Sequence, residues 1–327
     1  MLPRVARNVG RRTKPDDREV EACYRERENL ILATSPNPES IFKSPLVIFS
    51  VLGAISIAIW WGPLASLFAL ALRDEQYTHI LLILPMSTAL IFMGWEPPAG
   101  RSGLDATAGS TALAIALLAR AADVRLSLNI LALVAWWMGA FIFSFGTRSF
   151  RRALFPLCFL LGMVPLPQFA LDPLVSLLQQ GSTTSAHWFF AAAGLPVEQT
   201  GTLLHLPGLS LEVAPECSSI RSSMVLLVTT MFLAQLLLVS PWRKTVVVAA
   251  AIPLSVLKNG LRIFALGTLA IKVDPGFLTG RFHRQGGIIF FLIALIGIFL
   301  LLWILRRGEN QNPQAPEDGS QKAGSTG

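Results

Sequence analysis

Apolar residues along the chain fall into eight long runs separated by short polar segments. The runs cover residues 45–72, 79–95, 104–122, 127–146, 153–170, 220–240, 245–263 and 286–305. A helix needs ~17–25 apolar residues to cross roughly 30 Å of hydrocarbon, and each run is of that length or longer. The first run is long enough to be tilted or broken near Gly62-Pro63. The pattern predicts an all-α polytopic membrane protein with about eight transmembrane helices.

The longest stretch between runs, 171–219, predicts a small structure outside the bilayer. Its first part, LDPLVSLLQQGSTTSAHWFFAAAGLP, favours an amphipathic or interfacial helix with Trp188 at the headgroup boundary. The second part, VEQTGTLLHLPGLSLEVAPE, favours two short strands around a Pro207-Gly208 turn. We therefore expect an extracytoplasmic interfacial helix and a β-hairpin segment before the sixth span.

Composition and charge agree with a membrane protein. The chain is 53% hydrophobic and only 14% charged, whereas soluble domains carry about 25% charged residues. Its net charge of +7 comes largely from residues that flank the apolar runs, which is the usual positive-inside signal. The basic residues before the first run are Arg4, Arg7, Arg11, Arg12, Lys14, Arg18, Arg25, Arg27 and Lys43. No nucleic-acid partner is predicted.

The Lys and Arg bias also predicts the orientation of the helices. With the N-terminus in the cytoplasm, the cytoplasmic loops carry clusters such as Arg151-Arg152, while the outer segment 171–219 has neither Lys nor Arg. The outer loop around 272–285 is the exception, with Lys272, Arg281 and Arg284. We expect a cytoplasmic basic tail (1–44), a transmembrane domain (45–305) and a disordered cytoplasmic tail (306–327).

The cysteines and histidines indicate neither a disulfide framework nor a metal site. Cys23, Cys158 and Cys217 are too few for a framework, and the four dispersed histidines lack carboxylates at ligand spacing. Cys158 lies inside an apolar run, where a buried, inert thiol is expected. Hence no metal and no other cofactor is predicted.

Five polar residues converge on the outer side in this topology. Cys217 and Arg221 open the sixth span, Arg262 ends the seventh, His283 precedes the eighth and His79 begins the second. Singly, each has a simpler explanation: an apolar filler for the cysteine, snorkelling for the arginines, a helix cap or a solvated loop for the histidines. Together they predict a cysteine nucleophile site, because an imidazole can take the thiol proton and an arginine can stabilise an oxyanion.

One neighbour works against this chemistry. The carboxylate of Glu216, next to the cysteine, disfavours a thiolate unless its side chain points away or pairs with Arg221. The sequence leaves both alternatives open.

Several motifs resemble the exosortase/archaeosortase family. VAPECSSIRSS is similar to its cysteine motif, LKNGLRI to its arginine motif, FHRQGGIIFF to its histidine motif and EQYTHILLILP to the opening of its second span. VPLPQFALDPL and GLPVEQTGTLLHLPGLSLEV also match the family's approach to the cysteine. The resemblance covers about residues 45 to 305 in the expected order.

The resemblance implies a membrane cysteine protease or transpeptidase of the cytoplasmic membrane. Such enzymes cleave C-terminal sorting signals of membrane-anchored proteins, in bacteria the PEP-CTERM tail, at the outer face of the bilayer. The implied catalytic residues are Cys217, Arg262 and His283, with an acyl-enzyme on the cysteine. The residues expected to support the site or bind the substrate are Arg221, His79, Tyr77, Ser218 and Asn259.

Three positions depart from the family pattern. Ser219 replaces the glycine after Cys-Ser, Ile80 replaces the glycine after the second-span histidine, and Gly287 stands near a customary tryptophan. These departures indicate a divergent branch, for which a different recognition sequence is an alternative. We expect Arg221 and the basic outer loop 272–285 to bind the acidic residue of the sorting signal.

Two functions from other classes remain as alternatives. A transporter or carrier should have several polar residues near mid-membrane, yet Asn129, Gln235 and Asn259 are sparse. A non-catalytic scaffold of an exopolysaccharide export system is disfavoured, but not excluded, by the cysteine, arginine and histidine together. The sequence predicts neither the acceptor nucleophile nor the oligomeric state.

Overall fold

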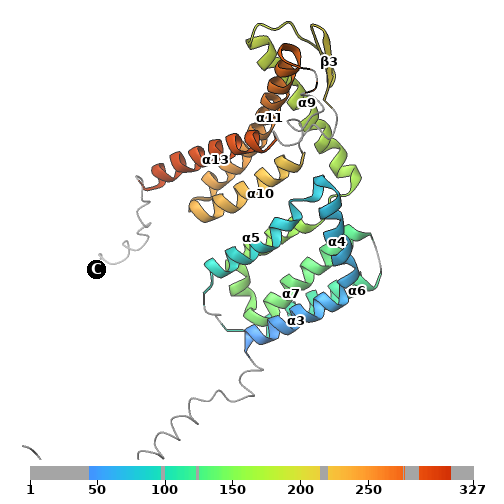
Figure 1. Ribbon diagram of the computed structural model, residues 1–327. Coiled ribbons are helices and arrows are strands. Elements are labelled where there is room, and N and C mark those ends of the chain that lie inside the picture. Colours follow the sequence, from blue (N-terminus) through green and yellow to red (C-terminus); the bar gives the residue numbers. More distant parts are fainter. Residues whose placement is uncertain are drawn as a thin grey trace, which may run out of the picture.

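The computed structural model describes residues 44–96, 100–122, 125–213, 220–274, 276 and 287–310, and these are mostly helical (Figure 1). The helices are α3 (Pro45–Ile59), α4 (Trp61–Arg73), η1 (Glu75–Tyr77), α5 (Ile80–Met93), α6 (Gly103–Ala121), α7 (Leu126–Arg152), α8 (Leu154–Phe159), η2 (Leu160–Met163), α9 (Gln168–Ala192), α10 (Ile220–Leu237), α11 (Pro241–Lys272) and α13 (Gly287–Asn310). The strands are β1 (Glu198–Thr200), β2 (Leu203–Leu206) and β3 (Leu209–Glu212). The predicted all-α polytopic fold is confirmed.

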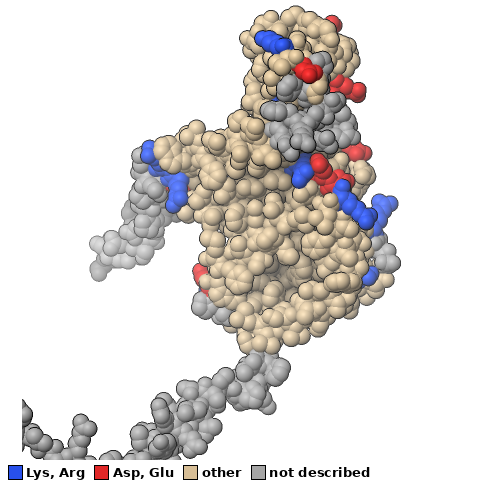
Figure 2. All heavy atoms as spheres, in the orientation of Figure 1, with Lys and Arg blue, Asp and Glu red and all other residues tan. Residues whose placement is uncertain are grey.

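Six helices of the described chain are long and apolar enough to cross a membrane, and the number rises to eight if each of two bent helix pairs is one span. The bent pairs are α3 with α4, at 76°, and α8–η2 with α9, at 92°. Figure 2 shows a broad uncharged surface over the helices, with Lys, Arg, Asp and Glu gathered toward its edges. The protein is therefore a multi-pass membrane protein, and about eight spans remains within the observed range.

The first bend lies at Trp60, two residues before the Gly62-Pro63 pair where the sequence predicts it. The Trp60 side chain is fully buried, and its Nε1–H donates to the carbonyl of Asn129 at 3.0 Å. Pro63 instead lies in the first turn of α4, where a missing N–H costs no intrahelical hydrogen bond. The proline also has no N–H for the carbonyl of Ile59, four residues earlier, and that carbonyl accepts from the Nε–H of Arg120 at 3.3 Å. Pro63 and the buried contact of Trp60 therefore both favour the break, which lies close to the predicted position.

The second bend divides the predicted fifth span, 153–170. α8 and η2 end at Met163, and α9 begins at Gln168 after a turn that contains Pro165 and Pro167. The expected interfacial helix is therefore a 25-residue helix that begins three residues early. Cys158 is exposed on α8, so the expectation of a buried thiol is wrong.

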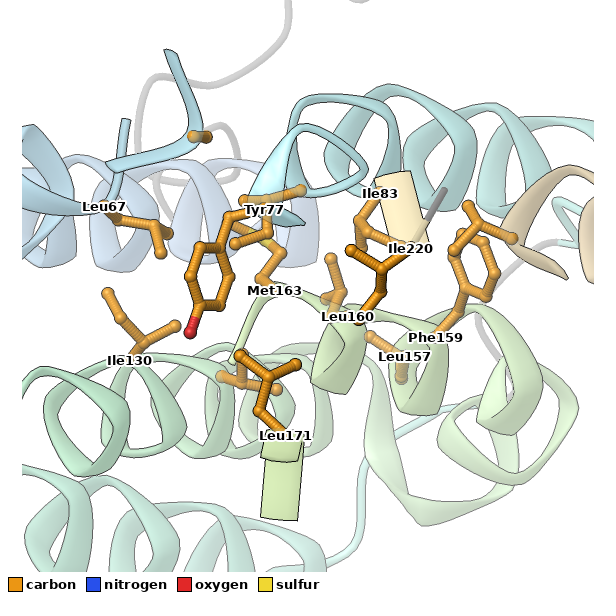
Figure 3. Close-up of a cluster of buried hydrophobic side chains, with 14 of the residues drawn as sticks. Leu67, Tyr77, Ile83, Ile130, Leu157, Phe159, Leu160, Met163, Leu171 and Ile220 are labelled. Atoms are coloured by element: carbon orange, nitrogen blue, oxygen red, sulfur yellow. The ribbon is translucent and has the colours of Figure 1, made fainter. Parts of the chain in front are cut away.

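One apolar core joins α4, η1, α5, α7, α8, η2, α9 and α10. It includes Leu67 of α4, Tyr77 of η1, Ile83 of α5, Met163 of η2 and Ile220 of α10. Figure 3 shows these side chains converging between the helices. The first residue of α10 is thus packed into the N-terminal half of the molecule.

Glycines allow α6 and α7 to pack closely. A Cβ at Gly109 would lie 2.6 Å from the backbone nitrogen of Phe143, and one at Gly139 would lie 2.9 Å from the Cβ of Ala112. Small residues at such contacts are typical of helix pairs in membranes. α7 has a kink at Gly146, near one end of the pair. There the carboxylate of Asp105, on α6, accepts from the backbone N–H of Thr147 at 3.1 Å and stabilises the kink.

α10, α11 and α13 form a second bundle, which is fastened at the end away from the sheet. Glu309 accepts from the backbone N–H groups of Val239 and Ser240 at 3.1 and 2.6 Å. Arg243 donates to the carbonyl of Leu305 at 2.8 Å. α13 continues to Asn310, so residues 306–310 are helical rather than disordered as expected.

The small sheet packs on the projecting ends of α9 and α11 (Figure 1). Its antiparallel order is β1-β2-β3, and Gly208 has a φ of 79° in the predicted Pro207-Gly208 turn. The hairpin is confirmed, and β1 adds a third strand that the sequence did not predict. Burial of Phe190, Leu204 and Ile263 in one cluster explains why α11 extends to Lys272, nine residues past its predicted end.

Candidate active site

The openings of the second and sixth spans meet at one end of the helices. Tyr77 is buried, and its hydroxyl donates to the carbonyl of Leu166 at 3.3 Å, which ties η1 to the turn before α9. Figure 3 shows the ring of Tyr77 among the core side chains that also surround Ile220. Tyr77 therefore anchors η1 in the apolar core and on the turn before α9.

His79 is the residue before α5 and is also buried. It makes no side-chain capping bond to α5, so the helix-cap explanation is wrong. Its Nδ1 lies 3.2 Å from the carbonyl of Gln76. Because a carbonyl only accepts, Nδ1 carries the proton in this contact, and in the neutral ring Nε2 is then the acceptor.

Arg221, in the first turn of α10, pairs with Glu75 of η1 at 3.1 Å. Both side chains are substantially exposed, at 51% and 77% respectively, so the pair is a surface contact. Glu216 lies outside the described residues, so both alternatives for its side chain stay open. The carboxylate that pairs with Arg221 in the described chain is that of Glu75. The pair joins the same two elements as the apolar contact of Ile220.

α11 brings two polar residues, Ser255 and Lys258, to the start of α10. The ammonium of Lys258 donates to the hydroxyl of Ser222, and the hydroxyl of Ser255 donates to that of Ser223. Asn259 follows Lys258 and is 1% exposed, while Arg262 lies one helical turn further along α11. The helix that carries the predicted catalytic arginine is thus fastened to the first turn of α10.

The other side of α11 is fixed by α9. A Cβ at Gly260 would lie 2.4 Å from the Oγ of Ser185 and 2.9 Å from the backbone nitrogen of Ala186. Earlier in α9, the amide of Gln179 donates to the carbonyl of Val213 at 2.5 Å. Val213, just after the sheet, is therefore anchored to α9, and Ile220, the first residue of α10, is anchored in the apolar core.

Three of the predicted site residues, Cys217, Ser218 and His283, lie outside the described residues. That they form one site with Arg262 stays a prediction. The structure does bring together the elements on which the other five lie: η1 and the start of α5 for Tyr77 and His79, the start of α10 for Arg221, and α11 for Asn259 and Arg262.

Two residues of this region escaped the sequence analysis. Glu75 was part of the EQYTHILLILP motif and Lys258 was part of the LKNGLRI motif, but neither was predicted to be a site residue. A signal was available for the lysine, because a charged residue inside an apolar run is costly and usually functional. Within the described ranges, no group of three His, Cys, Asp or Glu side chains could hold a metal ion.

Comparison with known proteins agrees with this arrangement. No curated protein and no solved structure matches the chain. A family model described as transmembrane exosortase matches residues 60–300, which is 241 of the 327 residues. The match includes every residue of the region described above, from Glu75 to Arg262, and both segments that carry Cys217 and His283. The chain belongs to the transmembrane exosortase family.

Proposed function

We propose that this exosortase is a membrane cysteine peptidase or transpeptidase. It cleaves C-terminal sorting signals of the PEP-CTERM type from exported, membrane-anchored proteins at the outer face of the cytoplasmic membrane. The observation that carries the proposal is the fastening of α10 to α11, through Lys258–Ser222 and Ser255–Ser223. Cys217 comes three residues before α10, and Arg262 lies one turn beyond Lys258.

The reaction divides between three residues. His283 takes the proton of the Cys217 thiol, and the sulfur attacks the scissile carbonyl carbon. Arg262 donates hydrogen bonds to the oxyanion of the tetrahedral intermediate. When the C–N bond breaks, the leaving amine takes the proton from His283 and a thioester remains on the cysteine. Water or another nucleophile then attacks the thioester, and the thiol is regenerated.

The length of α11 supports a site at the membrane boundary. At 1.5 Å per residue, the stretch from Pro241 to Arg262 is about 32 Å long, close to the roughly 30 Å of the hydrocarbon layer. The ten residues from Arg262 to Lys272 then extend about 15 Å further, beside the sheet. A substrate held by its own membrane helix would present its scissile bond at the level of Arg262, at the edge of the hydrocarbon layer.

The Glu75–Arg221 pair gives a prediction about substrate binding. If Arg221 binds the acidic residue of the sorting signal, Glu75 competes for it, and Glu75→Gln should lower the half-saturating substrate concentration about threefold. Because the pair is exposed, the free energy of unfolding should change by less than about 1 kcal/mol. The measurement is processing rate against reporter concentration in proteoliposomes, with Arg221→Gln as the opposite control. An unchanged or raised half-saturation in Glu75→Gln would argue against this role of Arg221.

The substrate class is tested with a reporter that ends in a PEP-CTERM tail. Cells that contain the exosortase should release a shortened reporter, whereas cells without it should retain the full-length form. A reporter with its Pro-Glu-Pro motif replaced by Ala-Gln-Ala should stay intact in both. Equal shortening in cells that lack the protein would overturn the proposal.

A further inference from the structure

Lys258 is a buried cation in the middle of a membrane helix. Only 5% of the residue is exposed, and the partner of its ammonium within the described chain is the Ser222 hydroxyl rather than a carboxylate. Burying an ammonium is costly in a membrane protein, and such residues are retained where they have a function. The proposed catalytic steps do not use it.

Two adjacent hydrogen bonds between side chains, which we call ties, join α10 and α11, and the Lys258–Ser222 bond is one of them. Ser223 and Ser255, the neighbours of Ser222 and Lys258, are buried and share a hydrogen bond. Hydrogen bonds between polar side chains stabilise helix pairs in lipid, and a charged donor makes the stronger bond. Both ties act on the first turn of α10, which Ile220 also anchors in the core.

The opposite end of the helix pair supplies a matched contact. There the ammonium of Lys244, also on α11, donates to the side-chain oxygen of Gln235 on α10 at 2.8 Å. It is the same kind of bond, from a lysine to an uncharged side chain, between the same two helices. It lies far from Arg262, which is more than four helical turns further along α11.

We propose that Lys258 is a positioning residue of the exosortase reaction, which holds the first turn of α10 on α11 through Ser222. This bond thereby fixes the position of the first residues of α10 relative to Arg262 on α11. The inference rests on the proposed function for its effect on catalysis, but the tie itself is independent of it. Lys258 acts through Ser222 and does not touch the substrate.

The first experiment is a mutant cycle on reporter processing. Lys258→Met should lower kcat about tenfold with KM changed less than twofold, since it disturbs the geometry of the reaction and not substrate binding. Ser222→Ala should cause a similar loss, and the double variant should be no worse than Lys258→Met alone, because both remove one interaction. Lys258→Arg should recover much of the activity, and Lys244→Met should leave it unchanged. Additive losses, or no recovery with arginine, would overturn the proposal.

The second experiment measures the tie without catalysis. In a protein with Cys23→Ser, Cys158→Ser and Cys217→Ala, the pair Ser223→Cys and Ser255→Cys should form a disulfide rapidly on mild oxidation, since the two serines are in contact. Adding Lys258→Met should slow this cross-link about fivefold or more, whereas adding Lys244→Met should not. An unchanged cross-linking rate would show that Lys258 does not hold α10, whether or not any form cleaves the reporter. Slowed cross-linking with no cleavage by the wild type would keep the tie and reject the proposed function instead.

Discussion

Replacing Cys217 with alanine is expected to abolish processing of the PEP-CTERM reporter, by about 10³-fold or more, because the thioester can no longer form. The variant should accumulate in the membrane at the wild-type level, since a cysteine-to-alanine change removes a single heavy atom, the sulfur. The measurement is the ratio of shortened to full-length reporter on immunoblots, normalised to the amount of exosortase. Hydroxylamine added during the reaction should release a reporter hydroxamate from the wild type only.

Cys158→Ala is the matched control for this experiment. Cys158 is an exposed thiol on α8, in the same membrane domain, and plays no part in the proposed reaction. Its replacement should leave processing at the wild-type rate. Processing that survives in Cys217→Ala at more than a few per cent would remove the nucleophile from the proposal. The carrier and the non-catalytic scaffold would then be the functions to test.

Gly260→Val is expected to have the largest effect on stability. A Cβ at this position would lie 2.4 to 2.9 Å from atoms of Ser185 and Ala186, one of them a backbone nitrogen. The backbone cannot move aside as a flexible side chain can, so α9 and α11 would be forced apart. We expect a loss of about 3 kcal/mol in the free energy of unfolding, the upper range for an overpacked core. The measurement is unfolding of the purified protein in detergent by heat or by SDS.

Gly53→Val separates this packing effect from the cost of valine in a helix. Gly53 lies in α3, and a Cβ there would meet no atom within 4 Å. The same substitution in open space should change stability by less than about 1 kcal/mol, since only helix propensity differs. Equal unfolding midpoints for the two variants would show that Gly260 is not in close contact with Ser185 and Ala186.

The sequence predicted the spans well where local composition alone determines them. The helices Gly103–Ala121 and Ile220–Leu237 begin and end within three residues of the predicted runs, because their ends follow the change from apolar to polar residues. The Pro207-Gly208 turn was predicted for the same local reason, through the positive φ that glycine adopts easily.

Features that depend on contacts between distant residues could not be predicted in this way. The burial of Trp60 at the first bend depends on the Asn129 carbonyl, which lies 69 residues away in the chain. The extension of α11 to Lys272 depends on its packing against Phe190 and the sheet. Likewise, the partner of Lys258 is Ser222, 36 residues earlier. The sequence shows a lysine inside an apolar run but not the residue to which it donates.

The length of α11 links the candidate site to the thickness of the bilayer. The stretch from Pro241 to Arg262 belongs to one helix, so the distance of the Arg262 Cα from the Pro241 end of that helix is set by the backbone. In a thicker membrane, Arg262 would be drawn into hydrocarbon unless the helix stood more upright or the lipids thinned around it, and each adjustment costs free energy. In a thinner membrane, α11 would tilt to bring the same residue back to the surface. The acyl-chain length of the surrounding lipids therefore contributes to the depth at which this exosortase presents Arg262.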